Sequence, residues 1–135
     1  MSLRARARST MAKMSPDPLA RPVLVVEDDA GVRAYLVAVL EHQGFRVIAA
    51  ENGEQALRIL EREPAQLCVL DIGLPGMDGY AIAEQLAEDV AVIMVTGDPI
   101  RAMGHERYQV LHKPLVPEAL EAAVANAVGI APAYS

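Results

Sequence analysis

Four short apolar stretches of this sequence each lead into polar residues that can take part in chemistry. The stretches and the residues that follow them are Val23 to Val26 with Glu27, Asp28 and Asp29; Leu67 to Leu70 with Asp71; Val92 to Val95 with Thr96; and Val110 to Leu111 with His112 and Lys113. Carboxylates, a hydroxyl and an amine form a set that can bind a metal ion and transfer a phosphoryl group. Asp71 is the candidate nucleophile, because a carboxylate can attack phosphorus and become an acyl phosphate.

The acidic residues predict a site for a hard divalent cation. Several carboxylates at one edge repel one another, which raises their pKa values unless a cation is present. A set of oxygen ligands without His or Cys favours Mg²⁺. We expect Asp28 and Asp71 to bind the metal directly and Glu27 to act through a water molecule. The role of Asp29 stays open, because consecutive residues that leave a strand point in different directions.

Thr96 and Lys113 are candidates for stabilising the charge on a transferring phosphoryl group. The ammonium of Lys113 would neutralise the phosphoryl oxygens together with the metal, while the hydroxyl of Thr96 donates to one of them. Gly97 follows Thr96 and leaves the pocket beside it open. Pro114 fixes a turn after Lys113, and the sequence alone leaves open whether the peptide bond between them is cis.

These side chains can meet only if the apolar stretches are strands of one parallel sheet. Patterns typical of helices lie between the stretches, at Val32 to Leu40, after the N-cap residue Asn52, at Tyr80 to Ala87 and at Pro117 to Val128. Arg46 to Ala50 is a fifth candidate strand. Crossovers of this length, between strands that are apolar on both faces, predict a doubly wound α/β fold with a five-stranded parallel sheet. Such sheets bind ligands outside the carboxyl ends of their strands, so the polar residues above should gather at one edge.

Length and composition predict a single domain. A chain of 135 residues, 53% of them hydrophobic, can bury one complete core. We divide it into a flexible basic N-terminal segment (1–21), one domain (22–129) and a C-terminal tail (130–135). The apolar runs are too short to cross a membrane and no secretory signal is recognisable, so we expect a cytoplasmic protein that does not bind membranes.

Charge is unevenly distributed along the chain. The net charge is −6, yet the first 21 residues are basic, with Arg4, Arg6, Arg8, Lys13 and Arg21. The rest of the chain is therefore strongly acidic, which argues against direct binding of nucleic acid. The one cysteine, Cys68, lies within an apolar stretch and fits a small core residue in a reducing compartment.

In their order and spacing these motifs resemble the receiver domain of two-component response regulators. The matching segments are Val23 to Asp29, Asp71-Ile72-Gly73-Leu74-Pro75-Gly76-Met77-Asp78-Gly79, Thr96-Gly97 and Lys113-Pro114-Leu115, and the resemblance covers Arg21 to Gly129. It implies a flavodoxin-like (βα)5 fold with strand order 2-1-3-4-5.

The same resemblance implies how the site would work. Asp71 would take a phosphoryl group from a phosphohistidine on a histidine kinase or a histidine phosphotransfer protein and later lose it by hydrolysis. Mg²⁺ would be required, with the backbone carbonyl of Gly73 completing its site. The domain would be a signalling module rather than an enzyme, although it would assist its own phosphotransfer and dephosphorylation. Phosphorylation would switch its conformation and so control contacts with other proteins.

Two departures from the family pattern affect how a signal would leave the domain. Val110 stands where receivers usually carry the aromatic residue of the switch, and Tyr108, on the same strand face, is the candidate replacement. Only 16 residues separate Thr96 from Lys113, and Pro99 to Arg107 lacks an amphipathic pattern, so the fourth helix should be short or irregular. In this it partly resembles single-domain and kinase-attached receivers of the FAT GUY type, which leaves the oligomeric state open.

Several alternatives remain at the level of sequence. The chain could be a phosphate sink, a degenerate interaction module or the receiver of a hybrid histidine kinase, although intact Asp71, Thr96 and Lys113 argue against degeneracy. A haloacid-dehalogenase-like phosphatase would need a second carboxylate two residues after the nucleophile, where Gly73 stands. A dinucleotide-binding domain would need the motif G-x-G-x-x-G after the first strand, and none is present. The cognate kinase and the downstream partner stay undetermined.

Overall fold

The computed structural model describes residues 21–74, 79–86, 90–98 and 108–129. In chain order the elements are β1 (Val23–Val26), α2 (Ala30–His42), β2 (Val47–Ala50), α3 (Gly53–Arg62), β3 (Leu67–Asp71), α4 (Gly79–Glu84), β4 (Ala91–Thr96), β5 (Gln109–His112) and α6 (Pro117–Val128). The predicted alternation of strands and helices is confirmed, and α6 has the predicted bounds.

The five strands form one parallel sheet with the order β2-β1-β3-β4-β5. The predicted doubly wound fold and its strand order are therefore confirmed. β1 and β3 lie at the centre, and β1 pairs with β3 from Val23 with Leu67 to Val26 with Leu70. This register brings the carboxyl ends of the two strands side by side, which is the geometry that the candidate site requires.

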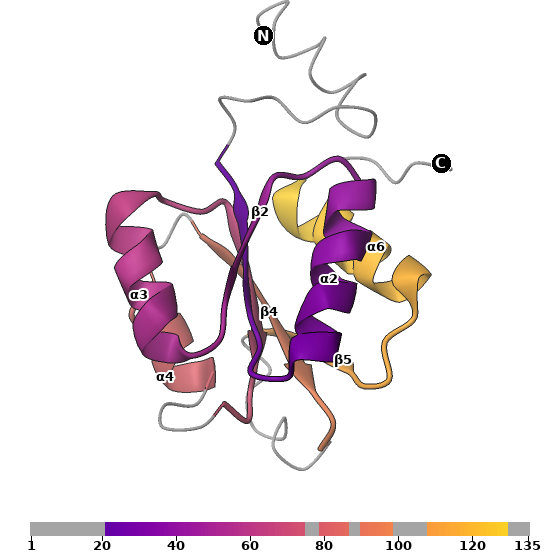
Figure 1. The fold of residues 1–135 in the computed structure, drawn as a ribbon. Helices are drawn as coiled ribbons and strands as arrows, with labels where there is room; N and C mark the ends of the chain where they lie inside the picture. Colours follow the sequence, from indigo (N-terminus) through magenta and orange to yellow (C-terminus); the bar gives the residue numbers. More distant parts are fainter. Residues whose placement is uncertain (1–20, 75–78, 87–89, 99–107, 130–135) are drawn as a thin grey trace, which may run out of the picture.

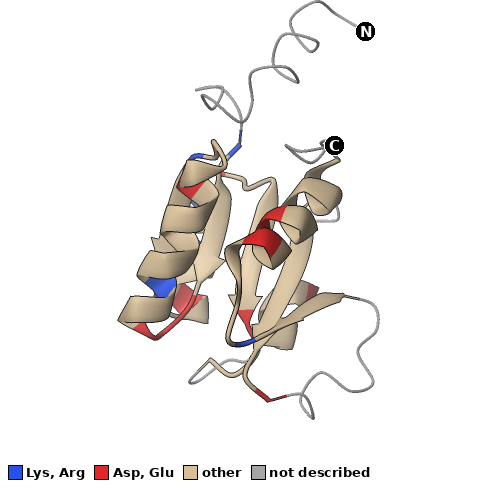
Figure 2. Cartoon of the chain, turned by 90° about the vertical axis from the view of Figure 1, so that its right-hand side faces the viewer, with Lys and Arg blue, Asp and Glu red and all other residues tan. Residues whose placement is uncertain are grey.

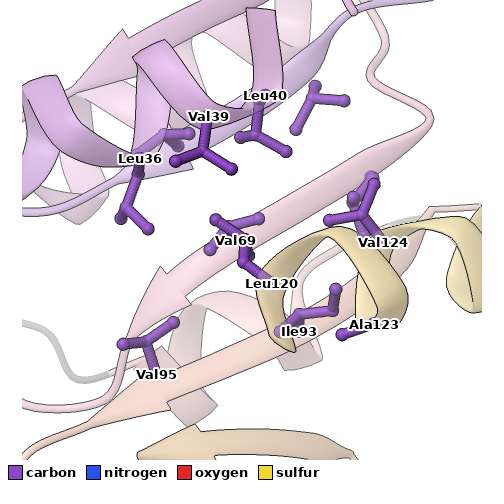
Figure 3. Close-up of a cluster of buried hydrophobic side chains, with 12 residues drawn as sticks. Leu36, Val39, Leu40, Val69, Ile93, Val95, Leu120, Ala123 and Val124 are labelled. Atoms are coloured by element: carbon purple, nitrogen blue, oxygen red, sulfur yellow. The ribbon is translucent and has the colours of Figure 1, made fainter. Parts of the chain in front are cut away.

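Helices cover both faces of the sheet (Figure 1): α2 and α6 lie on one face, α3 and α4 on the other. Successive residues of β1 serve different faces, because side chains alternate along a strand. Val23 and Val25 join the cluster under α2 and α6, whereas Leu24 and Val26 join the cluster under α3 and α4. Figure 3 shows the first cluster, in which side chains of both helices meet those of the central strands. β1 and β3 are buried on both faces, as their uninterrupted apolar runs predict, whereas the edge strands β2 and β5 are partly exposed.

Helix ends follow local signals in the sequence. Asn52 caps α3 as predicted, since its side chain accepts a hydrogen bond from the backbone N–H of Gln55. α4 is shorter than the expected Tyr80 to Ala87, because the hydrogen bonds beyond Glu84 change from the α-helical to the 3₁₀ type. Gln85 and Leu86 each bond to a carbonyl three residues back rather than four. The expectation of a longer helix is therefore wrong.

Parts of the sequence-based account fall on residues outside the described ranges. These are the fourth helix at 99–107, most of the basic segment 1–21 and the tail 130–135. Among the described residues, no helix combines the length and the apolar character needed to cross a membrane.

Candidate functional site

The carboxyl ends of the strands bring together acidic residues from separate parts of the chain. Carboxylate oxygens of Glu27, Asp28 and Asp71 all lie within 4.8 Å of one another. Figure 2 shows acidic and basic segments of separate elements at the lower end of the sheet, where these strands end. The predicted acidic cluster is confirmed. Its all-oxygen set of ligands fits Mg²⁺, which takes one or two carboxylates and keeps several water molecules.

Asp71 is the last residue of β3, and its carboxylate is held from two sides. Oδ1 accepts a hydrogen bond of 2.9 Å from the backbone N–H of Gly73, and Oδ2 lies 3.4 Å from Nζ of Lys113. The side chain is 12% exposed, so Asp71 is not completely buried.

Gly79, the first residue of α4, packs against the backbone of Asp71. A Cβ atom at Gly79 would lie 2.8 Å from the carbonyl oxygen of Asp71 and 3.1 Å from Cα of Ile72. The N–H of Gly79 also donates a hydrogen bond to the carbonyl of Ile72. The glycine is needed because the loop after Asp71 returns directly onto the strand end.

Glu27 is buried, with 1% of its surface exposed, and forms an ion pair that the sequence did not predict. Nζ of Lys113 lies 2.9 Å from its Oε1, and the backbone N–H of Asp29 donates to its Oε2 at 3.2 Å. Burial raises the pKa of Glu27 to about 7, although the bonds from Lys113 and Asp29 oppose this rise. The only sequence signal for this burial is that Glu27 directly follows a strand that is buried along its whole length.

Lys113 connects two of the carboxylates. Burial disfavours the charge of its ammonium, but the carboxylates of Glu27 and Asp71 outweigh this and hold the pKa of Lys113 above its ordinary value. Its backbone N–H donates to the carbonyl of Thr96 at 2.7 Å, which joins the ends of β4 and β5. The peptide bond from Lys113 to Pro114 is cis, so the isomer that the sequence left open is settled.

Asp29, whose role the sequence left open, caps a helix. Its Oδ1 accepts a hydrogen bond of 2.9 Å from the N–H of Val32, which makes it the N-cap of α2. Side-chain caps of this kind satisfy one of the free N–H groups in the first turn of a helix. The three consecutive acids therefore have different surroundings: Glu27 is buried, Asp28 is exposed within the cluster, and Asp29 belongs to α2.

Thr96 ends β4 and is 2% exposed. Its hydroxyl donates to the carbonyl of Asp98 at 3.0 Å and accepts from the N–H of Asp98 at 2.9 Å. The hydroxyl thus bonds to its own loop here, and its predicted contact with a phosphoryl group stays a prediction. A Cβ atom at Gly97 would meet no atom of the described residues within 4 Å, which agrees with the open space expected beside Thr96. The role predicted for the carbonyl of Gly73 also stays a prediction.

Tyr108 and Val110 pack on the same face of the sheet, as expected, within the cluster under α3 and α4. Tyr108 lies directly before β5 and is half-buried, and its ring centroid is 6.1 Å from that of Tyr80. Its suggested part in a switch stays a prediction.

Comparisons with known proteins agree with this geometry. A family model described as the response regulator receiver domain matches residues 23–125. The chain is 40% identical over 111 residues to a protein of Porphyra purpurea named probable transcriptional regulator ycf27, a match that covers 76% of this chain and 45% of that protein. A protein of the same name from Guillardia theta is 35% identical over 111 residues, with 76% and 43% covered. This chain thus spans less than half the length of these relatives.

Solved structures show the same fold. A response regulator receiver domain protein (CheY-like) from Methanospirillum hungatei JF-1 superposes with a TM-score of 0.73 at 25% identity, covering 82% of this chain and 94% of that one. A receiver domain protein from Clostridium thermocellum gives a TM-score of 0.72 at 25% identity, covering 81% and 94%.

Proposed function

The chain belongs to the receiver domain family of response regulators, and we propose that it accepts a phosphoryl group on Asp71 within a two-component phosphorelay. One observation carries the proposal: the carboxylate of Asp71 lies at the end of a buried strand, within 4.8 Å of Glu27 and Asp28 and 3.4 Å from Nζ of Lys113. In this arrangement a carboxylate nucleophile lies within a candidate cation site and beside an ammonium group.

Mg²⁺ is the cofactor that we propose for this reaction. Asp28 and Asp71 would hold it directly, with the carbonyl of Gly73 as a third ligand and Glu27 acting through water. When bound, the ion neutralises charge on the transferring group. The buried ion pair of Glu27 with Lys113 keeps the ammonium close to Asp71, so Lys113 does not have to be ordered during the reaction.

The phosphodonor that we propose is a phosphohistidine on a histidine kinase or a histidine phosphotransfer protein. An oxygen of Asp71 would form a bond to phosphorus as the bond from phosphorus to the histidine nitrogen breaks. The histidine leaves with that electron pair. The phosphoryl group would later pass to water. These steps modify the chain itself, so we propose a signalling domain and not an enzyme acting on external substrates.

A groove beside Lys113 supports a protein as the donor. It has a volume of about 530 Å³ and is lined by Gly31, Val32, Tyr35, Lys113, Pro114 and Leu115. Val116, next to it, is the large hydrophobic residue among the described ones that is exposed, at 55%. Phosphoryl transfer requires the reacting atoms to approach within about 3 to 3.5 Å. Lys113 lines the groove and lies 3.4 Å from Asp71, so a protein donor docked on this apolar groove would lie beside the candidate nucleophile.

We further propose that phosphorylation switches contacts with other proteins. The hydroxyl of Thr96 would leave the backbone of Asp98 and donate to a phosphoryl oxygen, which changes the loop after β4. Whether this chain then controls transcription, drains phosphate from another regulator or serves a hybrid kinase depends on partners outside it. Cys68 is buried as a thiol, which fits action in the reducing cytoplasm.

Beryllofluoride, a phosphoryl analogue, tests the proposal without a cognate kinase. With Mg²⁺ it should bind the wild-type chain and shift backbone NMR signals around Asp71, Thr96 and Lys113. Neither Asp71→Ala with Mg²⁺ nor wild type without Mg²⁺ should respond. Equal shifts in Asp71→Ala would show that binding occurs elsewhere.

A further inference from the structure

The side chain of Arg33, in the first turn of α2, bonds to two successive carbonyl groups of the acidic turn. Its Nη1 donates to the carbonyl of Glu27 at 2.9 Å and to that of Asp28 at 3.4 Å. Its backbone N–H donates to the carbonyl of Asp29 at 2.8 Å, which is the ordinary first hydrogen bond of α2 and does not depend on the side chain. The side chain of Arg33 therefore binds the main chain of Glu27 and Asp28.

These bonds matter because the turn has left the sheet. β1 ends at Val26, and buried or half-buried carbonyl groups beyond the ladder need other partners. Nη1 of the guanidinium group supplies both bonds, and the rigid planar fork fixes the directions in which its N–H groups point. The direction of the Asp28 side chain depends on this main chain, because Asp28 is exposed and its side chain is not buried in the core.

We propose that Arg33 is a positioning residue that holds Asp28 and Glu27 in the arrangement that binds the metal. This inference rests on the proposed function, since it concerns the affinity of the same site for Mg²⁺. Residues that orient metal ligands through hydrogen bonds commonly change metal affinity by about 10- to 100-fold when they are replaced. Arg33 would do so through backbone carbonyls.

Arg33 also lies near Glu51, but this contact is weaker. The distance from Nη2 to Oε1 of Glu51 is 3.7 Å, and the Glu51 side chain is 67% exposed. Exposed pairs of this kind contribute little. Glu51→Gln therefore serves as a control that removes the ion pair and leaves the carbonyl bonds of Arg33 in place.

Charge and positioning predict opposite results for Arg33→Met. By charge alone, the loss of a cation beside an acidic cluster should strengthen Mg²⁺ binding. If Arg33 positions the ligands, the dissociation constant for Mg²⁺ should instead rise about 10-fold. Arg33→Lys keeps the charge without the fork and should give an intermediate value.

Calorimetric titration of the unphosphorylated full chain with Mg²⁺ measures this directly. Asn52→Ala, which removes the N-cap of α3, is a control for general loss of stability. It should bind Mg²⁺ like wild type, as should Glu51→Gln. With acetyl phosphate as donor, the Mg²⁺ concentration for half-maximal modification should rise in Arg33→Met, while the rate at saturating Mg²⁺ stays close to that of wild type.

Binding by Arg33→Met that is as tight as or tighter than wild type would overturn the inference. An equal loss in Asn52→Ala would also overturn it, because the effect would then follow stability and not the acidic turn. If wild type itself fails to bind Mg²⁺, the metal site of the proposed function fails.

Discussion

Replacing Lys113 with methionine should destabilise the protein by an amount that grows with pH. The substitution keeps most of the apolar side chain but removes the ammonium 2.9 Å from the buried carboxylate of Glu27. Without that partner Glu27 must remain protonated in the folded state, and its pKa rises above the value of about 7 that it has beside Lys113.

The magnitude follows from the linkage between protonation and folding. In the metal-free wild type, Glu27 has a raised pKa, so stability falls as pH rises from 4.5 towards 7 and then levels off once Glu27 is ionised in both states. In Lys113→Met the fall continues above pH 7 at up to roughly 1.4 kcal/mol per pH unit. With a folded-state pKa of about 7 in wild type, we expect a loss of less than about half a kcal/mol at pH 7 and roughly 2 kcal/mol at pH 8.5. The larger value lies below the range of about 3 to 5 kcal/mol for breaking a buried pair, as suits a lysine that is 26% exposed.

Urea denaturation followed by circular dichroism, with EDTA present, measures these differences between pH 6 and 8.5. The same substitution in a Glu27→Gln background is the matched control. There the cost of Lys113→Met should be small and nearly independent of pH, because no buried carboxylate is left without its partner. A constant difference across the pH range, or equal growth in the control background, would refute the reasoning.

Further predictions concern the loops beside Asp71. Gly79→Ala should reduce the free energy of unfolding by about 1 to 3 kcal/mol, since its Cβ would lie 2.8 Å from the Asp71 carbonyl oxygen. Gly97→Ala should be nearly neutral, because its Cβ would meet no atom within 4 Å among the residues that the structure describes. Urea denaturation of both variants measures the two losses of stability. Equal losses would contradict the prediction, because they would show that the backbone around Gly79 shifts to make room for the Cβ atom. Asp29→Ala removes the N-cap of α2 and should reduce the free energy of unfolding by about 1 kcal/mol. It should nevertheless bind Mg²⁺ far more tightly than Asp28→Asn does. Calorimetric titration decides this, and equal losses of affinity would make Asp29 a ligand.

The fold could be predicted from sequence because its signals are local. Val23 to Val26 is apolar without interruption, and the structure buries all four side chains. The order of the strands needed the family resemblance, because a strand pattern does not say which strand lies beside it. The length of α4 could not be predicted, since its end depends on bonds with carbonyls three residues back.

The sequence predicted which residues form the candidate site, but it did not predict which of them contact one another. Strand ends placed Asp28, Asp71 and Lys113 at one edge, and the structure brings them together. The ion pair of Lys113 with Glu27 was missed, because it depends on how far a side chain reaches across the sheet edge. The hydrogen bonds of Arg33 were missed for a related reason. Every residue has a backbone carbonyl, so the sequence does not show which carbonyls accept a hydrogen bond from a side chain.

Locating the phosphoryl group tests the central claim most directly. The chain is incubated with acetyl phosphate and Mg²⁺, the acyl phosphate is trapped by borohydride reduction, and the modified residue is identified by peptide mass spectrometry. The account predicts modification at Asp71 that depends on Mg²⁺ and is absent from Asp71→Ala. Modification at another carboxylate, or none with any phosphodonor, would contradict it.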